Sequence, residues 1–218
     1  MTRAVRRAHS FAKTANEWGT RLGRKVIWLQ TFGERMIDAK EGRPAGPPKL
    51  PVERRPHIPS AGAIPDDAAN MPDTMGYDAG KKRLLVGHGF VENVETEVWT
   101  YEVSGQQVLL QWFSYRKLHQ ERPIIGDRRP PSPLGDIQPD HWLPEYTTEL
   151  LNVLNVLGLL VELEPAQANL LENVCSGPVI TSEELRAAGA LDLPPKEKKS
   201  GKKPSGPGLF DKDGKAQA

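Results

Sequence analysis

Basic and aromatic side chains lie close together in two short stretches of this 218-residue sequence. The first stretch is Lys81-Lys82-Arg83. The second begins with Tyr115-Arg116-Lys117 and continues, between prolines, with Arg122, Arg128 and Arg129. Lysine and arginine form charge-assisted hydrogen bonds to phosphates, and arginine can also read guanine with two bonds in the major groove. Such side chains are therefore candidates for contacts to DNA.

The same residues also have a plainer explanation. Both stretches could be solvated charged loops, with Arg116 holding an internal carboxylate such as Asp127 or Asp136. Composition alone favours this explanation, and the residues themselves leave both alternatives open.

The distribution of charge limits where DNA could bind. The formal net charge is only +1, and residues 196–218 hold seven lysines against three acids. The rest of the chain has 22 basic and 25 acidic residues. A DNA-binding surface on the folded part must therefore be a local patch, because the overall charge does not attract a polyanion.

Other kinds of site find little support in the sequence. The five histidines are scattered, and although His141 and Glu145 could share a helix face, zinc needs three or four ligands. Residues 76–82 resemble a phosphate-binding loop only superficially, since they lie on a predicted hairpin and lack the Ser or Thr that follows the lysine. We expect no catalytic residue, metal or cofactor, and we expect Cys175 to be an inert buried thiol.

Targeting signals are weak as well. The first 18 residues lack the apolar segment of a secretory signal, and a single cysteine allows no intrachain disulfide. The longest apolar stretch, near residues 150–162, is shorter than the roughly 20 residues that span a bilayer. We expect a cytoplasmic protein without a membrane partner.

Apolar spacing predicts the elements of the first half. Steps of three and four from Phe11 to Leu29 predict a helix within residues 4–38. Residues 41–73 contain eight prolines and predict an extended connector, which either wraps the domain or separates the first helix from it. Residues 74–103 read as short strands, with a hairpin turning at residues 78–81 and a further strand at "GFVENV".

Alternation then predicts a strand at residues 98–104, with Trp99, Tyr101 and Val103 on one face. Gly105 opens a helix that carries Val108, Leu109, Trp112 and Phe113 on one side.

The second half is predicted to be helical. Residues 145–164 are apolar over most of the helix surface, so this helix should be central to the core. Residues 165–177 predict a second helix that starts at Pro165 and completes a helical hairpin. Thr181 and Glu184 form a capping box before a short helix.

Together these elements predict an α+β fold, with a small antiparallel sheet packed on a helical hairpin, an N-terminal helix and a disordered C-terminal tail. The predicted divisions are an N-terminal helical segment (1–40), a proline-rich connector (41–73), an α+β domain (74–193) and a disordered lysine-rich tail (194–218).

One motif resembles a known family. Trp99-x-Tyr101-x-Val103-x-Gly105 is followed by Val108-Leu109, Trp112 and Tyr115-Arg116. This order is similar to the C-terminal target-recognition (specificity) region of type ISP restriction–modification enzymes and related adenine-N6 DNA methyltransferases. The stretches "LGRKVIWLQTFGERM" before it and "IIGDRRPPSPLGDIQPDHWLPEYTTELL" after it fit as well, so the resemblance covers about residues 10–190.

The resemblance implies a DNA target-recognition module that positions double-stranded DNA for a methyltransferase. Family members also carry a helicase-like ATPase, sometimes a nuclease, and a methyltransferase with an Asn-Pro-Pro-Tyr-type motif. This sequence contains no Asn-Pro-Pro. We therefore expect a detached specificity subunit or fragment that neither methylates nor cuts alone, and whose partner is a methyltransferase or helicase polypeptide.

On this hypothesis Lys81, Lys82, Lys117 and Arg122 would hold phosphates, while Arg128 and Arg129 would read bases. Arg83, Tyr115 and Arg116 complete the candidate DNA-binding residues. The alternative is a protein-interaction piece, in which the connector and the helical hairpin dock on a separate methyltransferase or helicase chain. The acidic balance of the folded part favours that alternative somewhat.

Overall fold

The computed structural model describes residues 3–118 and 139–189 and divides the chain into two compact units. One unit comprises residues 9–177, and the other comprises residues 1–8 and 178–218. In the second unit, α5 (Ser182–Ala187) has the predicted capping box: Thr181 accepts from the Glu184 N–H, and Glu184 accepts from the Thr181 N–H. The predicted tail at 194–218 lies outside the described residues.

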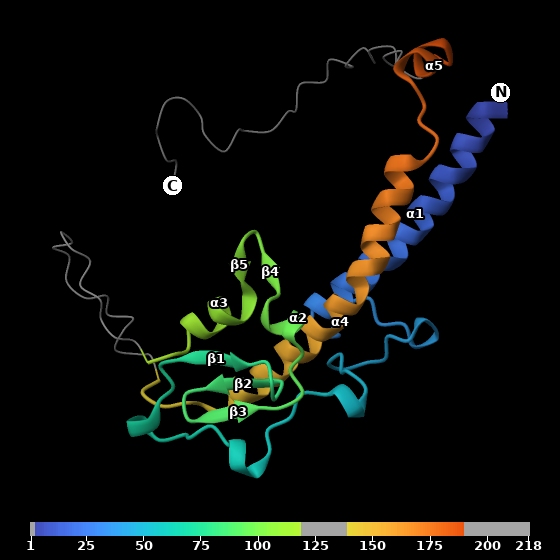
Figure 1. Cartoon of the computed structure of the whole chain (residues 1–218). Coiled ribbons are helices and arrows are strands. Elements are labelled where there is room, and N and C mark those ends of the chain that lie inside the picture. Colours follow the sequence, from blue (N-terminus) through green and yellow to red (C-terminus); the bar gives the residue numbers. More distant parts are fainter. Residues whose placement is uncertain (1–2, 119–138, 190–218) are drawn as a thin grey trace, which may run out of the picture. The chain divides into compact units, whose positions relative to one another are not determined.

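A three-stranded antiparallel sheet is built from β1 (Met75–Asp78), β2 (Arg83–Val86) and β3 (Gly89–Val91), in that order (Figure 1). Asp78 pairs with Arg83, so residues 79–82 form the hairpin loop, and Lys82 takes a positive φ of 51° there. The predicted hairpin and the third strand are confirmed. Leu84, Val86 and Val91 are fully buried beneath the sheet.

The predicted strand at residues 98–104 is wrong. Its first two residues end the single helical turn α2 (Thr96–Trp99), and only β4 (Glu102–Val103) pairs with β5 (Gln106–Gln107). A strand would send Val98 and Trp99 to opposite faces. The helical turn instead buries Val98 in the core and stacks the Trp99 ring on Tyr77, with centroids 5.8 Å apart. Val103 is 57% exposed.

The helix after this hairpin is confirmed as α3 (Val108–Ser114), with Leu109 and Phe113 buried and Val108 and Trp112 against the core. Gly105 does not open it. With φ of 76°, Gly105 and the preceding Ser104, also at positive φ, form the tight turn of the β4–β5 hairpin.

The predicted helical hairpin at residues 145–177 is also wrong, because α4 (Pro144–Ser176) is one continuous helix with Pro165 inside it. Proline removes one helical hydrogen bond and usually breaks a helix. Pro165 lies on the exposed, outer half of α4, where neighbouring residues 164–169 are exposed as well. The α+β class itself is confirmed, with helices alongside a small antiparallel sheet.

The helix that lies antiparallel to α4 is α1 (Arg3–Gln30), as Figure 1 shows. Gly19 of α1 faces Leu170 of α4, and the Phe11 ring lies against Gly177. Leu22, Val26 and Leu29 contact the core, as their spacing predicted. We call residues 10–25 of α1 together with residues 163–176 of α4 the outer helix pair.

Residues 41–73 wrap the domain, which is one of the two arrangements that the prolines allowed. Short 3-10 turns at Ala39–Glu41, Val52–Arg54, Ser60–Gly62 and Ala68–Asn70 interrupt this segment. The Leu50 N–H donates to Asn155 Oδ1 of α4 at 2.8 Å, and the backbone of His57 pairs with Glu92 after β3. Pro48, Leu50 and Met71 are buried, so the connector is part of the core.

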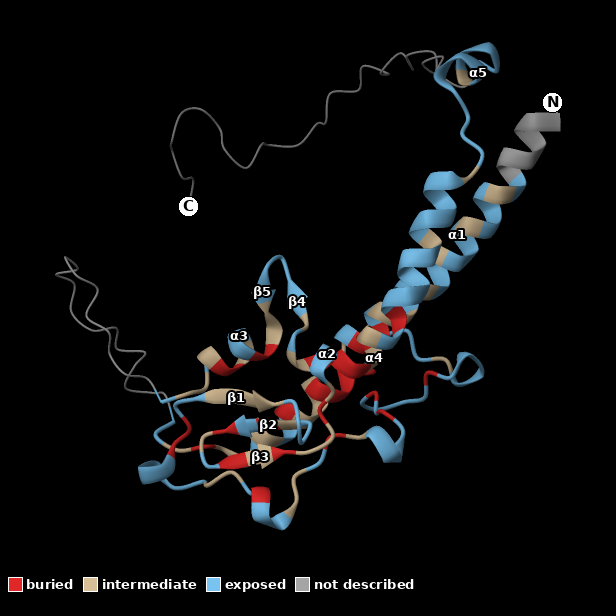
Figure 2. Ribbon diagram, viewed as in Figure 1, coloured by how far each residue is buried: buried red, intermediate tan, exposed pale blue. Residues whose placement is uncertain are grey.

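The first half of α4 is the centre of that core, as predicted (Figure 2). Leu150, Leu154 and Leu157 are buried with Trp142 just before the helix. By length and composition alone α4 could cross a membrane. Within residues 9–177, however, its apolar half is buried in the core and packs against α2.

Candidate nucleic-acid interface

The β1–β2 loop presents the first basic stretch on the surface. Lys81 is 65% exposed, with a weak ion pair to Asp78 at 4.0 Å. Lys82 donates from Nζ to Glu95 Oε2 at 2.7 Å, and this hydrogen bond raises the pKa of Lys82 above its ordinary value. Arg83 donates from Nε and Nη2 to Glu92 Oε1 and lies 4.2 Å from the centre of the Phe90 ring.

The second stretch follows α3. Arg116 donates from Nε and Nη2 to Glu149 Oε2 of α4, at 3.1 and 2.7 Å, and from Nη1 to the Trp112 carbonyl. Its guanidinium also lies 4.2 Å from the centre of the Trp112 ring. Arg116 thus holds an internal carboxylate, as the plainer explanation proposed, but the carboxylate is Glu149. Tyr115 is 71% exposed, and Lys117 is half-buried.

The two stretches lie at opposite ends of β1. The Leu118 N–H donates to the Pro72 carbonyl, just before β1 begins, whereas Lys81 and Lys82 follow its last residue. They therefore do not form one cluster. Arg122, Arg128 and Arg129 lie outside the described residues, so their proposed contacts to DNA stay predictions.

Carboxylates neutralise much of this charge. Within residues 3–118 and 139–189, Lys81, Lys82, Arg83 and Arg116 each form an ion pair with an acid. Arg83 and Arg116 are held by two hydrogen bonds and an aromatic ring, which fixes them as part of the fold. Lys81, Lys82 and Tyr115 are more exposed and can turn toward a phosphate at little cost.

A second set of basic residues is spread along one helix instead of forming a continuous basic run. Lys13, Arg21, Arg24 and Lys25 lie along α1, where Glu17 is the single acid between residues 10 and 30. None of the four has an ion-pair partner among the described residues. The sequence does contain a signal for this surface. Trp18, Arg21 and Lys25 are spaced by three and four residues, which places them on one face of a helix.

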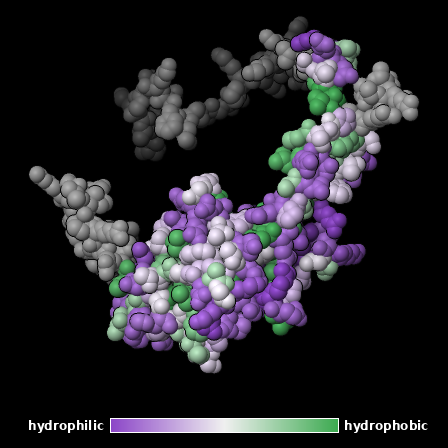
Figure 3. All heavy atoms as spheres, in the orientation of Figure 1, coloured by the Kyte–Doolittle hydropathy of each residue, from purple (hydrophilic) through white to green (hydrophobic). Residues whose placement is uncertain are grey.

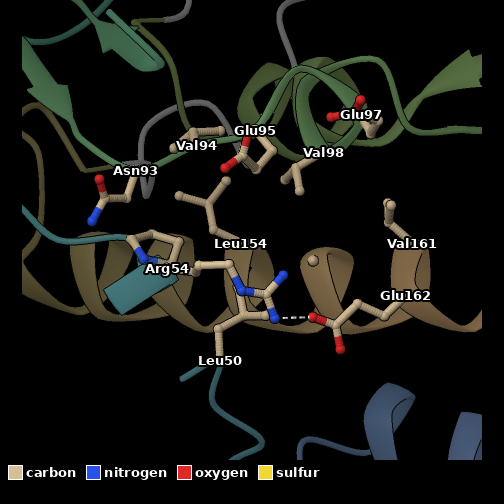
Figure 4. A pocket seen from close by; sticks show the side chains of 12 residues that line it. Leu50, Arg54, Asn93, Val94, Glu95, Glu97, Val98, Leu154, Val161 and Glu162 are labelled. Carbon is tan, nitrogen blue, oxygen red and sulfur yellow. Dashed lines mark hydrogen bonds and ion pairs between the residues drawn. The ribbon is translucent and has the colours of Figure 1, made fainter. Parts of the chain in front are cut away.

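The pocket in Figure 4 has the opposite character. Its volume is about 190 Å³, its floor is apolar, and Glu95, Glu97 and Glu162 lie at its rim. Arg54 bonds to Glu162 across it. Pockets for small ligands usually exceed about 300 Å³, and acidic side chains repel phosphate. This pocket is therefore a poor candidate for nucleic acid.

Metal and thiol chemistry find no support within the described residues. No group of three or more His, Cys, Asp or Glu side chains could hold an ion there. His141 instead meets Asp140 at 2.8 Å, and that hydrogen bond lowers the pKa of Asp140. The expectation of a buried Cys175 is wrong, because the thiol lies on the exposed outer face of α4.

Comparison with protein families decides the assignment. The family model described as "Type ISP C-terminal specificity domain" matches residues 10–153, well over half of the chain. The chain belongs to this type ISP specificity family. The membership confirms the resemblance seen in the motif around Trp99 and gives the chain a target-recognition role in type ISP restriction–modification. No curated protein and no solved structure matches the chain.

The type ISP match also separates two parts of the molecule. It begins inside α1, at residue 10, and includes the connector, the sheet and the first ten residues of α4. The basic side chains of both stretches lie inside it. The outer half of α4, with Pro165 and Asn169, lies beyond it.

Proposed function

We propose that this type ISP specificity domain binds duplex DNA and positions it for a methyltransferase, and that it does no chemistry itself. The family match is the observation that carries the proposal. The geometry supports it at two places, the loop with Lys81 and Lys82 and the surface at Tyr115 and Lys117. These side chains supply phosphate contacts that set the register of the protein on the duplex.

A salt titration tests the proposal. A labelled duplex, enriched from a randomised pool by binding to the protein, is titrated by fluorescence anisotropy between about 50 and 200 mM salt. Each phosphate contact steepens the logarithmic salt dependence by about 0.9. The double variant Lys81→Gln/Lys82→Gln should therefore flatten the slope by about 1 to 2, while Lys40→Gln, an exposed lysine elsewhere on the surface, leaves it unchanged. A salt-independent affinity, or no enrichment, contradicts DNA binding.

A second candidate function is docking on a separate methyltransferase or helicase chain. The observation that favours it is apolar surface on the outer helix pair, where Leu171 is 64% and Val174 48% exposed. Figure 3 shows apolar patches along this part of the molecule. Nuclease-treated pull-downs distinguish the two functions, because docking retains the methyltransferase without DNA. Loss of this partner in Leu171→Ser/Val174→Ser would support docking, whereas loss after nuclease treatment alone would support binding through DNA.

A further inference from the structure

A groove with exposed aromatic and basic side chains runs between α1 and α4 in the outer helix pair. Its volume is about 560 Å³. Trp18, Arg21 and Lys25 line it from α1, Pro165 and Asn169 line it from α4, and Arg43 lies beside them. Since pockets for small ligands measure about 300–1,000 Å³, the groove has room for one nucleotide.

The groove is positively charged. Arg21 and Lys25 have no ion-pair partner among the residues that the structure describes. Arg43 is buried, donates from Nε to the Met36 carbonyl and bonds to Glu41, so this pair is fixed and nearly neutral. Glu41 also lines the groove, but it is bonded to Arg43, which leaves Arg21 and Lys25 as lining cations without a partner in the described parts of the chain. The pocket of Figure 4 has three glutamates in its lining.

Trp18 adds a flat apolar surface beside these charges. Its side chain is 60% exposed, although burial of a tryptophan would stabilise the fold. Residues 18, 21 and 25 are spaced by three and four, so the ring and both cations share one face of α1. Asn169 lines the groove from α4; its Oδ1 accepts from the Asn173 amide, so its own NH2 group is the part that can donate to a ligand.

We propose that this groove binds one unstacked nucleotide of a DNA strand. Its base lies on the Trp18 ring, its phosphate is held by Arg21 and Lys25, and Asn169 bonds to the edge of the base. Proteins that hold single strands combine cationic grooves with aromatic stacking in this way. An acidic peptide would satisfy the two cations, but its carboxylate side chains would not stack on the Trp18 ring. The proposal rests on the proposed function in one respect, namely that the DNA bound by the specificity domain supplies the strand.

A labelled single-stranded oligonucleotide of mixed sequence tests the groove directly, with binding followed by anisotropy. Trp18→Ala should weaken binding by about 5- to 150-fold, which corresponds to the loss of one base–aromatic stack. Arg21→Gln/Lys25→Gln should weaken it at least about tenfold and flatten the salt slope by about 1.4, since single strands give about 0.7 per contact. The matched control is Lys13→Gln/Arg24→Gln, which removes the same charge from α1 outside the groove and should change affinity less than about threefold.

Circular dichroism verifies that each variant folds, and Trp18→Phe provides a second variant that keeps an aromatic ring and should retain most of the affinity. Equal losses in the groove variants and the control would overturn the proposal, because binding would then follow the net charge of α1. Binding of a mononucleotide as tight as that of the oligonucleotide would overturn the assignment to a DNA strand. Duplex binding that survives all groove variants leaves the proposed function intact, so the two failures are distinguishable.

Discussion

Arginine and aromatic side chains have different roles in two regions of the molecule. One region is the outer helix pair, and the other, which we call the sheet end, is the three-stranded sheet with α3 and the first half of α4. At the sheet end, Arg83 lies over Phe90 and bonds to Glu92, and Arg116 lies over Trp112 and bonds to Glu149. In the outer helix pair, Trp18 is exposed, and Arg21 and Lys25 lie near it without an ion-pair partner in the described chain. An arginine beside an aromatic ring stabilises the fold in the first region and is left open to a ligand in the second.

This difference shows that a run of basic letters is a poor guide to a binding surface. Each carboxylate near such a run removes part of its attraction for phosphate, and two hydrogen bonds to the same carboxylate oxygen also fix the arginine in place. Positive charge that remains unpaired on a folded surface is the more informative feature. On that criterion α1 is as strong a candidate for contact with DNA as the hairpin loop.

The two regions should differ most in how they respond to lost apolar contacts. Leu154 is fully buried in the core, whereas Leu171 is 64% exposed on the outer helix pair. Leu154→Ala should lower the free energy of unfolding by about 2–5 kcal/mol, and Leu171→Ala by less than about 0.5 kcal/mol. Urea denaturation followed by circular dichroism measures both. Similar losses in the two variants would mean that the outer helix pair is packed in solution like the sheet end.

The connector should be sensitive at one buried hydrogen bond. Asn155 accepts from the Leu50 N–H at 2.8 Å and donates to the Leu151 carbonyl at 2.7 Å. Asn155→Ala leaves the buried Leu50 N–H without a partner and should cost about 1–3 kcal/mol. Asn152→Ala, the same substitution one turn earlier at a half-buried position, is the control and should cost less. Limited proteolysis within residues 41–73 should increase in the first variant alone, and equal cleavage would show that the connector is held elsewhere.

Local patterns predicted part of this fold. The hairpin turn after β1, the spacing along α1 and the capping box at Thr181 each act over a few residues, and the structure has all three, with the turn one residue later than predicted. A single helical turn such as α2 is too short to show the helical period of about 3.6 residues. The alternation of apolar and polar residues there therefore wrongly predicted a strand. Pro165 was misread because its tolerance depends on exposure, which no local pattern records.

The candidate site was harder to predict for a related reason. The acids that neutralise Lys82, Arg83 and Arg116 are 13, 9 and 33 residues away in sequence. Only the pairing of β2 with β3 and the packing of α3 on α4 bring them together. Tertiary structure therefore decides which cations remain available, and the groove beside Trp18 depends on contacts between residues about 150 positions apart.

Neighbouring residues at the end of α3 should separate a structural cation from a DNA-binding one. Arg116→Gln removes two bonds to Glu149 and the stack on Trp112, and should lower the free energy of unfolding by about 1 kcal/mol, since the partly exposed pair is screened by water. Lys117→Gln should change it by less than about 0.5 kcal/mol but should weaken duplex binding more. Thermal melts and anisotropy on the same samples measure the two effects. The reverse ranking would make Arg116 the DNA contact.

The smallest expected effect concerns the Lys82–Glu95 pair, which is exposed but still shifts a titration. The hydrogen bond and charge of Glu95 raise the pKa of Lys82 above 10.5, so the folded state favours the charged amine. Any stability from the pair is therefore present below about pH 10.5 and is lost as the pH rises through the higher folded value. An NMR titration of the Lys82 Cε resonance should show this raised pKa in the native protein and its return toward 10.5 in Glu95→Gln. If the pKa does not change in that variant, the pair does not persist in solution and Lys82 is as free for phosphate as the cations of α1.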